Sequence, residues 1–151
     1  LIAKSLDFGV TDYNSPLLMD AEIPAANGFT TIEGLSVLAQ LMANRGEVNG
    51  VRLISEEIAT KAMTPFETDF DVVLSKNITR TVGGFAQLKA IAGVEMYGWA
   101  GMGGSLFLFD PVHNISFTYL MNGMFPGLAT TEGRALDLCQ TFLESARKHD
   151  I

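Results

Sequence analysis

Apolar residues recur at helical spacing between residues 30 and 46. One face of a helix there would collect Leu35, Leu38, Leu41 and Met42. Thr30 and Glu33 form the Thr-x-x-Glu pattern of a capping box, which predicts that the helix begins at this point. Gly46 follows the last apolar position and is expected to end the helix.

The next segment carries a turn signal and a second helix signal. The dipeptide Asn49-Gly50 lies between two valines, which predicts a hairpin with a tight two-residue turn. Ser55 is expected to cap a short helix that runs through Met63 and stops before Pro65. These two helices are the only ones we expect before the end of the chain.

A terminal helix is predicted over residues 130–148. Its apolar stripe would consist of Ala135, Leu138, Cys139 and Phe142. Residues 1–28 and 66–80 show neither the helical nor the strand period and are rich in polar and turn-forming side chains. We therefore expect irregular chain in both of these segments.

Three segments are predicted to be strands, residues 81–90, 105–109 and 115–122. The short link at residues 110–114 makes the last two antiparallel neighbours. Both are apolar at alternating and intervening positions alike, which favours a sheet that is covered on both faces. The order of elements predicts an α+β fold: a three-stranded antiparallel sheet, the terminal helix packed on it, and two further helices.

Composition narrows the class of protein. The 151 residues fit one domain, residues 1–151, and the first residue is Leu, so we expect a segment of a longer chain. A net charge of −7 argues against nucleic-acid binding, because phosphate contacts need basic clusters. No apolar run is long enough to span a membrane. The single cysteine excludes a disulfide within the chain, and nothing in the sequence assigns a compartment.

Metal and nucleotide chemistry find no support in the sequence. His113 and His149 are isolated, so no pair of side chains has the spacing of metal ligands. The acidic run at residues 67–71 lacks the glycine and the closing glutamate of a calcium loop and is expected to be solvated. The glycine cluster after residue 97 leads into a predicted strand, whereas a dinucleotide fingerprint precedes a helix. We expect neither a metal nor an organic cofactor.

The only tryptophan, Trp99, stands within a cluster of four glycines, in the stretch GWAGMGGSLFLFDP at residues 98–111. Closely spaced glycines are typical of backbone that must approach another group. A strand kinked by glycines, with its tryptophan in the core, is the alternative. The residues alone favour this second interpretation.

Three stretches resemble one family. EIPAANGFTTIEGLSVLAQLMANRGEVNGVRLIS, GGFAQL and GWAGMGGSLFLFDPVHNISFTYLMNGM are similar to the C-terminal part of the serine β-lactamase-like hydrolases. This superfamily includes class C β-lactamases, penicillin-binding-protein relatives and family VIII carboxylesterases. The resemblance covers the chain from about residue 23 onward. It implies that the whole protein hydrolyses a small-molecule acyl ester through a serine acyl-enzyme.

The resemblance also assigns site residues. The family's third motif, Lys-Thr-Gly or His-x-Gly, is commonly Trp-x-Gly in its esterase-like members, and here it is Trp99-Ala100-Gly101. By position, the backbone N–H of Met102 would belong to the oxyanion hole. Trp99, Gly101 and Met102 are therefore the catalytic candidates, and Ala100 and Gly103 would shape the substrate groove. Tryptophan in place of a cationic lead residue suits an ester better than a carboxylate-bearing β-lactam.

The family's other catalytic motifs are missing from the sequence. Its nucleophile and base lie in Ser-x-x-Lys, and the only such pattern here, Ser145 to Lys148, falls at the end of the terminal helix. No Tyr-x-Asn occurs. We therefore expect this chain alone to be inactive, and a non-catalytic binding module of the same fold is the alternative, as is an unrelated interaction domain. Without the family's N-terminal strands, an open strand edge and part of an apolar face should make the chain self-associate.

Overall fold

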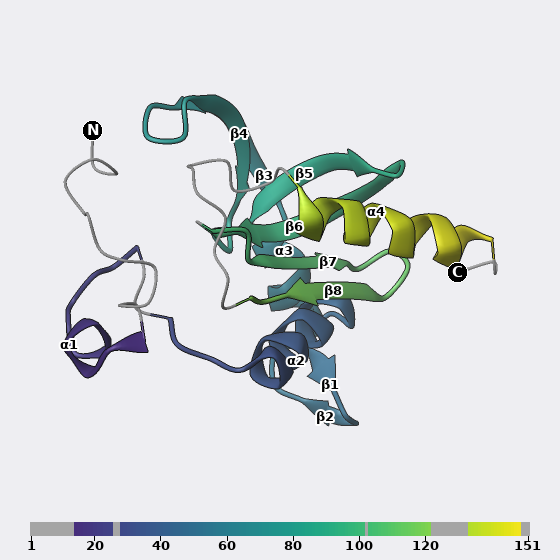
Figure 1. Cartoon of the computed structure of the whole chain (residues 1–151). Coiled ribbons are helices and arrows are strands. Elements are labelled where there is room, and N and C mark those ends of the chain that lie inside the picture. Colours follow the sequence, from purple (N-terminus) through teal and green to yellow (C-terminus); the bar gives the residue numbers. More distant parts are fainter. Residues whose placement is uncertain (1–13, 26–27, 102, 122–132, 149–151) are drawn as a thin grey trace.

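The computed structural model describes residues 14–25, 28–101, 103–121 and 133–148, and its fold is α+β (Figure 1). One antiparallel sheet has six strands whose spatial order follows the chain. Its strands are β3 (Pro65–Asp71), β4 (Lys76–Thr81), β5 (Ala86–Ile91), β6 (Val94–Ala100), β7 (Leu106–Asp110) and β8 (Ile115–Tyr119). The other elements are α1 (Pro16–Met19), α2 (Ile32–Ala43), β1 (Glu47–Val48), β2 (Val51–Arg52), α3 (Glu56–Ala62) and α4 (Arg134–Arg147).

The expected three-stranded sheet was too small. Residues 66–80, expected to be irregular, form most of β3 and β4. The expected strand at residues 81–90 is divided, because a turn with Gly84 at a φ of 82° separates the end of β4 from β5. β3 lies at the sheet edge with nearly all of its side chains exposed, so it lacks the apolar alternation that identifies a strand.

The helix and hairpin signals before residue 64 are largely confirmed. Ser55 accepts a hydrogen bond from the N–H of Ile58 and caps α3 as predicted. The turn at Asn49-Gly50 joins β1 to β2. The cap of α2 is Thr31 rather than Thr30, and its hydroxyl accepts from the N–H of Gly34. A four-residue helix, α1, also occurs where irregular chain was expected, because Ser15 caps it.

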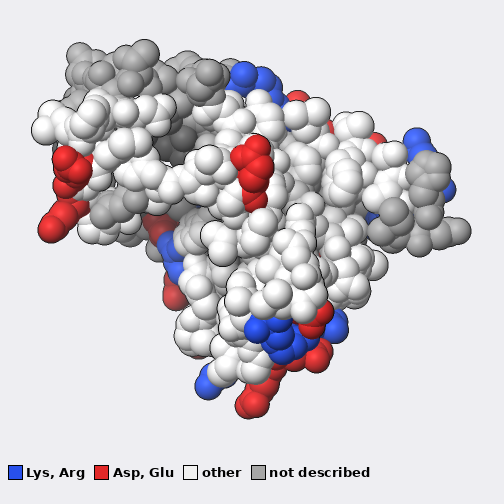
Figure 2. Space-filling view, turned by 90° about the horizontal axis from the view of Figure 1, so that it is seen from below, with Lys and Arg blue, Asp and Glu red and all other residues white. Residues whose placement is uncertain are grey.

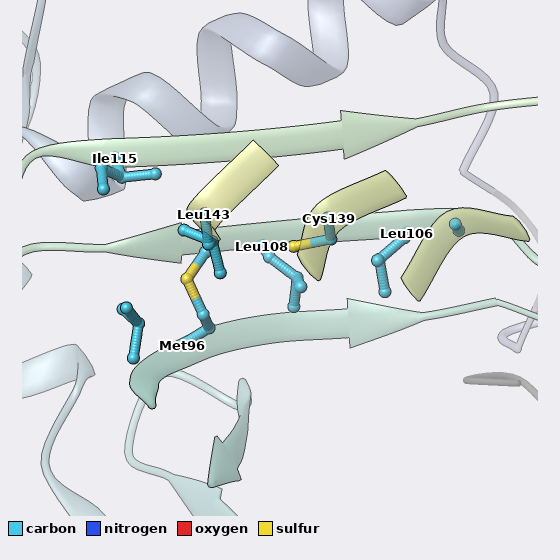
Figure 3. Close-up of a cluster of buried hydrophobic side chains, with 8 residues drawn as sticks. Met96, Leu106, Leu108, Ile115, Cys139 and Leu143 are labelled. Carbon is cyan, nitrogen blue, oxygen red and sulfur yellow. The ribbon is translucent and has the colours of Figure 1, made fainter. Parts of the chain in front are cut away.

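Helices cover both faces of the strands β6–β8, as the apolar pattern predicted. On one face α4 contributes to a cluster in which Met96, Leu108, Cys139 and Leu143 point toward one another (Figure 3). On the other face, residues of α2 and α3 pack around Phe109, which is fully buried. The centre of the sheet is therefore rigidly supported from both sides.

The buried stripe of α4 differs from the predicted one. Ala135 and Cys139 are buried as expected, but Leu138 and Phe142 are exposed, and Leu143 and Ala146 are buried in their place. The buried residues follow the spacing i, i+4, i+8 and i+11, so the stripe is rotated by one position along its second half. The residues 130–132 of the predicted helix lie outside the described part of the chain.

The surface carries wide uncharged areas. Figure 2 shows them on the face seen from below. Within the described residues, no helix is long and apolar enough to cross a membrane.

Candidate active site

The tryptophan motif stands at the end of β6. Trp99 is paired with Phe107 of β7 and Ala100 with Leu106, and the chain then leaves the sheet. Gly101 begins the turn that returns to β7, since its N–H donates to the carbonyl of Ser105 at 2.8 Å. The sequence-predicted candidates Trp99, Ala100 and Gly101 are thus consecutive along one rim of the sheet. Met102, the predicted oxyanion-hole donor, lies outside the described residues.

The glycines of this segment have different structural reasons. A Cβ on Gly98 would come within 1.9 Å of the carbonyl oxygen of Phe107, so the close approach of β6 and β7 requires glycine there. Gly103 and Gly104 have φ values of 88° and 110°, which other residues adopt with strain. Among the described residues, a Cβ on Gly101 would meet nothing closer than the Cβ of Ser105 at 3.4 Å. The described residues therefore favour glycine at the other three positions, whereas none of them clashes with a side chain at Gly101.

Trp99 is not a core residue. Its side chain keeps 39% of its surface exposed, and it belongs to neither of the two buried clusters. The guanidinium carbon of Arg80 lies 5.4 Å from the centroid of its ring. No aromatic ring of the described residues stacks on the indole. The interpretation of Trp99 as a buried strand residue is therefore wrong.

A cavity of about 380 Å³ opens beside Trp99 and Ala100. Its other walls come from the hairpin of β3 and β4 and from the start of β5. The side chains that line it there are Thr68, Leu74, Lys76, Asn77, Ile78, Thr79, Ala86, Gln87 and Leu88. We call this cavity the Trp99 groove. Its described lining combines aliphatic and hydrogen-bonding side chains with one charged residue, Lys76.

Sequence reasoning missed the β3–β4 wall of the groove. The acidic run at residues 67–71 was expected to be a solvated loop; residues 67–70 are exposed, but the run forms most of β3, and Asp71 keeps only 16% of its side chain exposed. Its Oδ1 accepts from the N–H groups of Val73 and Leu74, each at 2.9 Å, and its Oδ2 pairs with Arg80. The backbone N–H of Leu74 and the charge of Arg80 hold the pKa of Asp71 below its ordinary value. The alternation of Thr79 and Thr81 in β4 was the signal that could have revealed this wall.

The described residues assemble neither a nucleophile nor a metal site. Ser105, next to the glycine turn, has its hydroxyl hydrogen-bonded to the sulfur of Met121 at 3.9 Å, and no base lies beside it in the described part. Ser145 is exposed on α4, and Lys148 caps the end of that helix. In the same part of the chain, no group of three His, Cys, Asp or Glu side chains is placed so that it could hold a metal ion.

Comparison with known proteins identifies the family. The family model described as beta-lactamase matches residues 3–140. The chain belongs to the beta-lactamase family. Esterase/beta-lactamase LipL of Mycobacterium tuberculosis is 30% identical over 118 residues, which are 76% of this chain and 27% of LipL.

Two solved structures share the fold of this beta-lactamase family chain. A penicillin-binding protein homolog from Caulobacter crescentus superimposes with a TM-score of 0.72 at 26% identity, covering 87% of this chain and 38% of that one. A family VIII carboxylesterase superimposes with a TM-score of 0.63 at 24% identity, covering 76% of this chain and 30% of that one. The chain thus spans less than two-fifths of the length of each of these relatives.

Proposed function

We propose that this chain is the C-terminal part of a serine hydrolase that cleaves small-molecule acyl esters through a serine acyl-enzyme. The beta-lactamase family and the esterase named among its relatives suggest a hydrolase. One observation about the motif carries the proposal further. Among the described residues nothing clashes with a side chain at Gly101, so a group that approaches from outside these residues would account for the glycine. A substrate acyl group in the Trp99 groove is such a group.

In this proposal each residue of the motif has a defined task. The N–H of Met102 stabilises the oxyanion that develops on the substrate carbonyl, which needs a donor fixed before the reaction begins. Gly101 keeps the approach to that N–H clear, and Gly103 allows the turn that aims it. Trp99 and Ala100 form the wall against which the acyl group lies. Nucleophile and base come from residues outside these 151, and neither a metal nor an organic cofactor takes part.

A pair of glycine variants in the complete protein tests the proposal. Gly101→Ala should leave the free energy of unfolding nearly unchanged but lower kcat/KM for 4-nitrophenyl esters, because its Cβ would occupy substrate space. Gly98→Ala is the matched control, since its Cβ would clash with the backbone of β7 and destabilise the fold. If Gly101→Ala keeps full activity, the glycine is not there for substrate, and the assignment of the motif fails.

The 151-residue chain by itself should hydrolyse neither 4-nitrophenyl esters nor nitrocefin. Oxyanion donors without a nucleophile have no acyl-enzyme to stabilise. Ester turnover by the chain, abolished by a fluorophosphonate that labels a serine, would show that the nucleophile lies within it. A complete protein that lacks Ser-x-x-Lys would instead favour the non-catalytic binding module.

We also propose that the chain self-associates through its sheet edges. β3 is the outer strand at one end of the sheet, and β8 is the outer strand at the other end. Unpaired strand edges pair readily with a second chain. Of the apolar face expected to contribute, Leu106, Leu108 and Phe109 are buried, whereas Phe107, Phe117 and Tyr119 are only partly buried. A mass of 16.3 kDa at every concentration in sedimentation equilibrium would contradict the proposal.

A further inference from the structure

Arg80 links the β3–β4 hairpin to the indole of Trp99. Its guanidinium lies over the Trp99 ring, with its carbon 5.4 Å from the centroid, and its Nη2 pairs with Asp71. Asp71 is itself fixed, because its second oxygen accepts two backbone hydrogen bonds from the turn after β3. A continuous set of contacts therefore runs from the hairpin turn to the wall of the Trp99 groove.

This ion pair differs from an ordinary surface pair. Exposed pairs contribute little, since two long side chains lose freedom in a medium that screens their charges. Here the Asp71 carboxylate is mostly buried and is held in place by hydrogen bonds from backbone N–H groups, independently of its ion pair with Arg80. A guanidinium is planar and stacks on an aromatic face while it keeps its hydrogen bonds in the plane. Arg80 can thus bind Asp71 and cover one face of Trp99 at the same time.

The surrounding charges leave Arg80 committed to this arrangement. Glu67, Asp69 and Asp71 line a second cavity together with Arg80, and Asp71 is the carboxylate that pairs with it. Lys76 is the charged residue that lines the Trp99 groove, and no carboxylate of the described residues pairs with it. Arg80 is therefore paired with Asp71 while its guanidinium lies over the indole, although 41% of its side chain stays exposed.

We propose that Arg80 is a positioning residue that fixes the indole of Trp99 as the wall of the groove, and that Asp71 holds Arg80 in place. The functional part of this inference rests on the proposed ester hydrolysis at the same site. It gives the β3–β4 hairpin a role in that site. Arg80 does not touch the reacting atoms; it acts through Trp99.

The contact is directly measurable because Trp99 is the only tryptophan of the chain. Acrylamide, an uncharged quencher, reports how much of the indole collides with solvent independently of nearby charges. Loss of a cation from an exposed aromatic face should lower the ratio of stacked to unstacked indole by about two- to fivefold in Arg80→Met. Acrylamide quenching of Trp99 fluorescence should therefore rise in this variant. Unchanged quenching in Arg80→Met would overturn the proposal.

Three further variants make the result specific. Arg80→Lys keeps the charge without the planar surface and should fall between the parent and Arg80→Met. Asp71→Asn keeps an oxygen for the turn but loses the charge, so it should also raise quenching. Arg52→Met is the control, because Arg52 pairs with Glu47 in the β1–β2 hairpin and lies in a different sheet. Equal rises in Arg52→Met and Arg80→Met would show general loosening and refute a specific contact.

The second arm measures ester hydrolysis by the complete protein. Arg80→Met should lower kcat/KM by about two- to fivefold through the misplaced wall, with partial rescue in Arg80→Lys. An inactive parent protein would refute the proposed hydrolysis, while the quenching arm would still decide whether Arg80 fixes the indole. An active Arg80→Met with raised quenching and unchanged kcat/KM would refute the positioning role in the reaction.

Discussion

Truncation of Trp99 tests whether this residue forms a wall of the groove or belongs to the core. We compare Trp99→Ala with Phe109→Ala, since the two positions lie on adjacent strands of the same sheet. Phe109 has no exposed surface and packs against the rings of Phe85, Tyr97 and Phe107, with centroid separations of 4.9, 6.0 and 5.8 Å. Trp99 has 39% of its surface exposed and opens onto the groove. The two truncations should therefore differ in cost.

The expected magnitudes follow from burial. Phe109→Ala leaves a dry cavity in a packed cluster, and such truncations cost about 3–5 kcal/mol of unfolding free energy. Trp99→Ala widens a hollow that water already reaches, so the cavity contribution is largely absent. What remains is the free energy of transferring the buried part of the indole to water, which is about 1–3 kcal/mol at the usual hydrophobic free energy per unit of buried area. The larger residue should thus be the cheaper one to remove.

Urea unfolding followed by circular dichroism measures both costs in the 151-residue chain. In the complete protein, Trp99→Ala should lower kcat/KM for esters in the fraction that remains folded. A cost for Trp99→Ala equal to that of Phe109→Ala, together with full activity of the folded fraction, would refute the reasoning. Trp99 would then be a stability residue and the groove would have a different wall.

Three further predictions concern the rest of the fold. Burial raises the pKa of the Cys139 thiol to about 11. Iodoacetamide near neutral pH should therefore label this thiol only after the chain unfolds. Fast labelling of the native chain would show that α4 does not pack on the sheet. Burial and the nearby Glu95 carboxylate raise the pKa of Tyr97 from 10.0 to about 12. The neutral phenol therefore stabilises the fold fully below pH 10.0, and this stabilisation is lost as the pH rises from 10.0 to about 12. The urea midpoint of unfolding should fall less over this pH range in Tyr97→Phe than in the parent chain. Leu143→Ala should cost about 2–5 kcal/mol in urea unfolding, whereas Leu138→Ala on the exposed side of α4 should cost far less.

Local signals predicted the elements that are fixed by local chemistry. Ser55 caps a helix because its hydroxyl replaces a missing backbone partner, and Asn49-Gly50 turns because both residues adopt positive φ. Neither effect depends on distant residues. The strands β7 and β8 were predicted from their high content of apolar residues; β7 is buried at nearly every position, whereas β8 is only partly buried after Ile115.

The sheet edge could not be predicted in this way. β3 is held by pairing with β4 and by side-chain contacts such as the 2.7 Å hydrogen bond between Thr68 and Thr79. The sequence of β3 is largely polar, because an edge strand can stay paired with its neighbour while it buries little apolar surface. The groove wall depends on this hairpin, so the residues of the wall were missed with the strands. The place of Trp99 at the rim followed from the family resemblance, whereas its contact with Arg80 arises only from the tertiary fold.

The position of the groove follows from where the helices stop covering the sheet. α4 covers Met96, and the residues of α2 and α3 cover Phe109, so the middle of the sheet is supported on both faces. Trp99 lies at the end of β6, outside both clusters, and faces the cavity that the β3–β4 hairpin lines, with Arg80 of β4 over its ring. Within the described residues, the groove wall thus depends on the β3–β4 hairpin and on the contact between Arg80 and Trp99 rather than on a helix. Loss of that contact should loosen the indole before it affects the core, because elements held by few apolar contacts open at a lower free-energy cost.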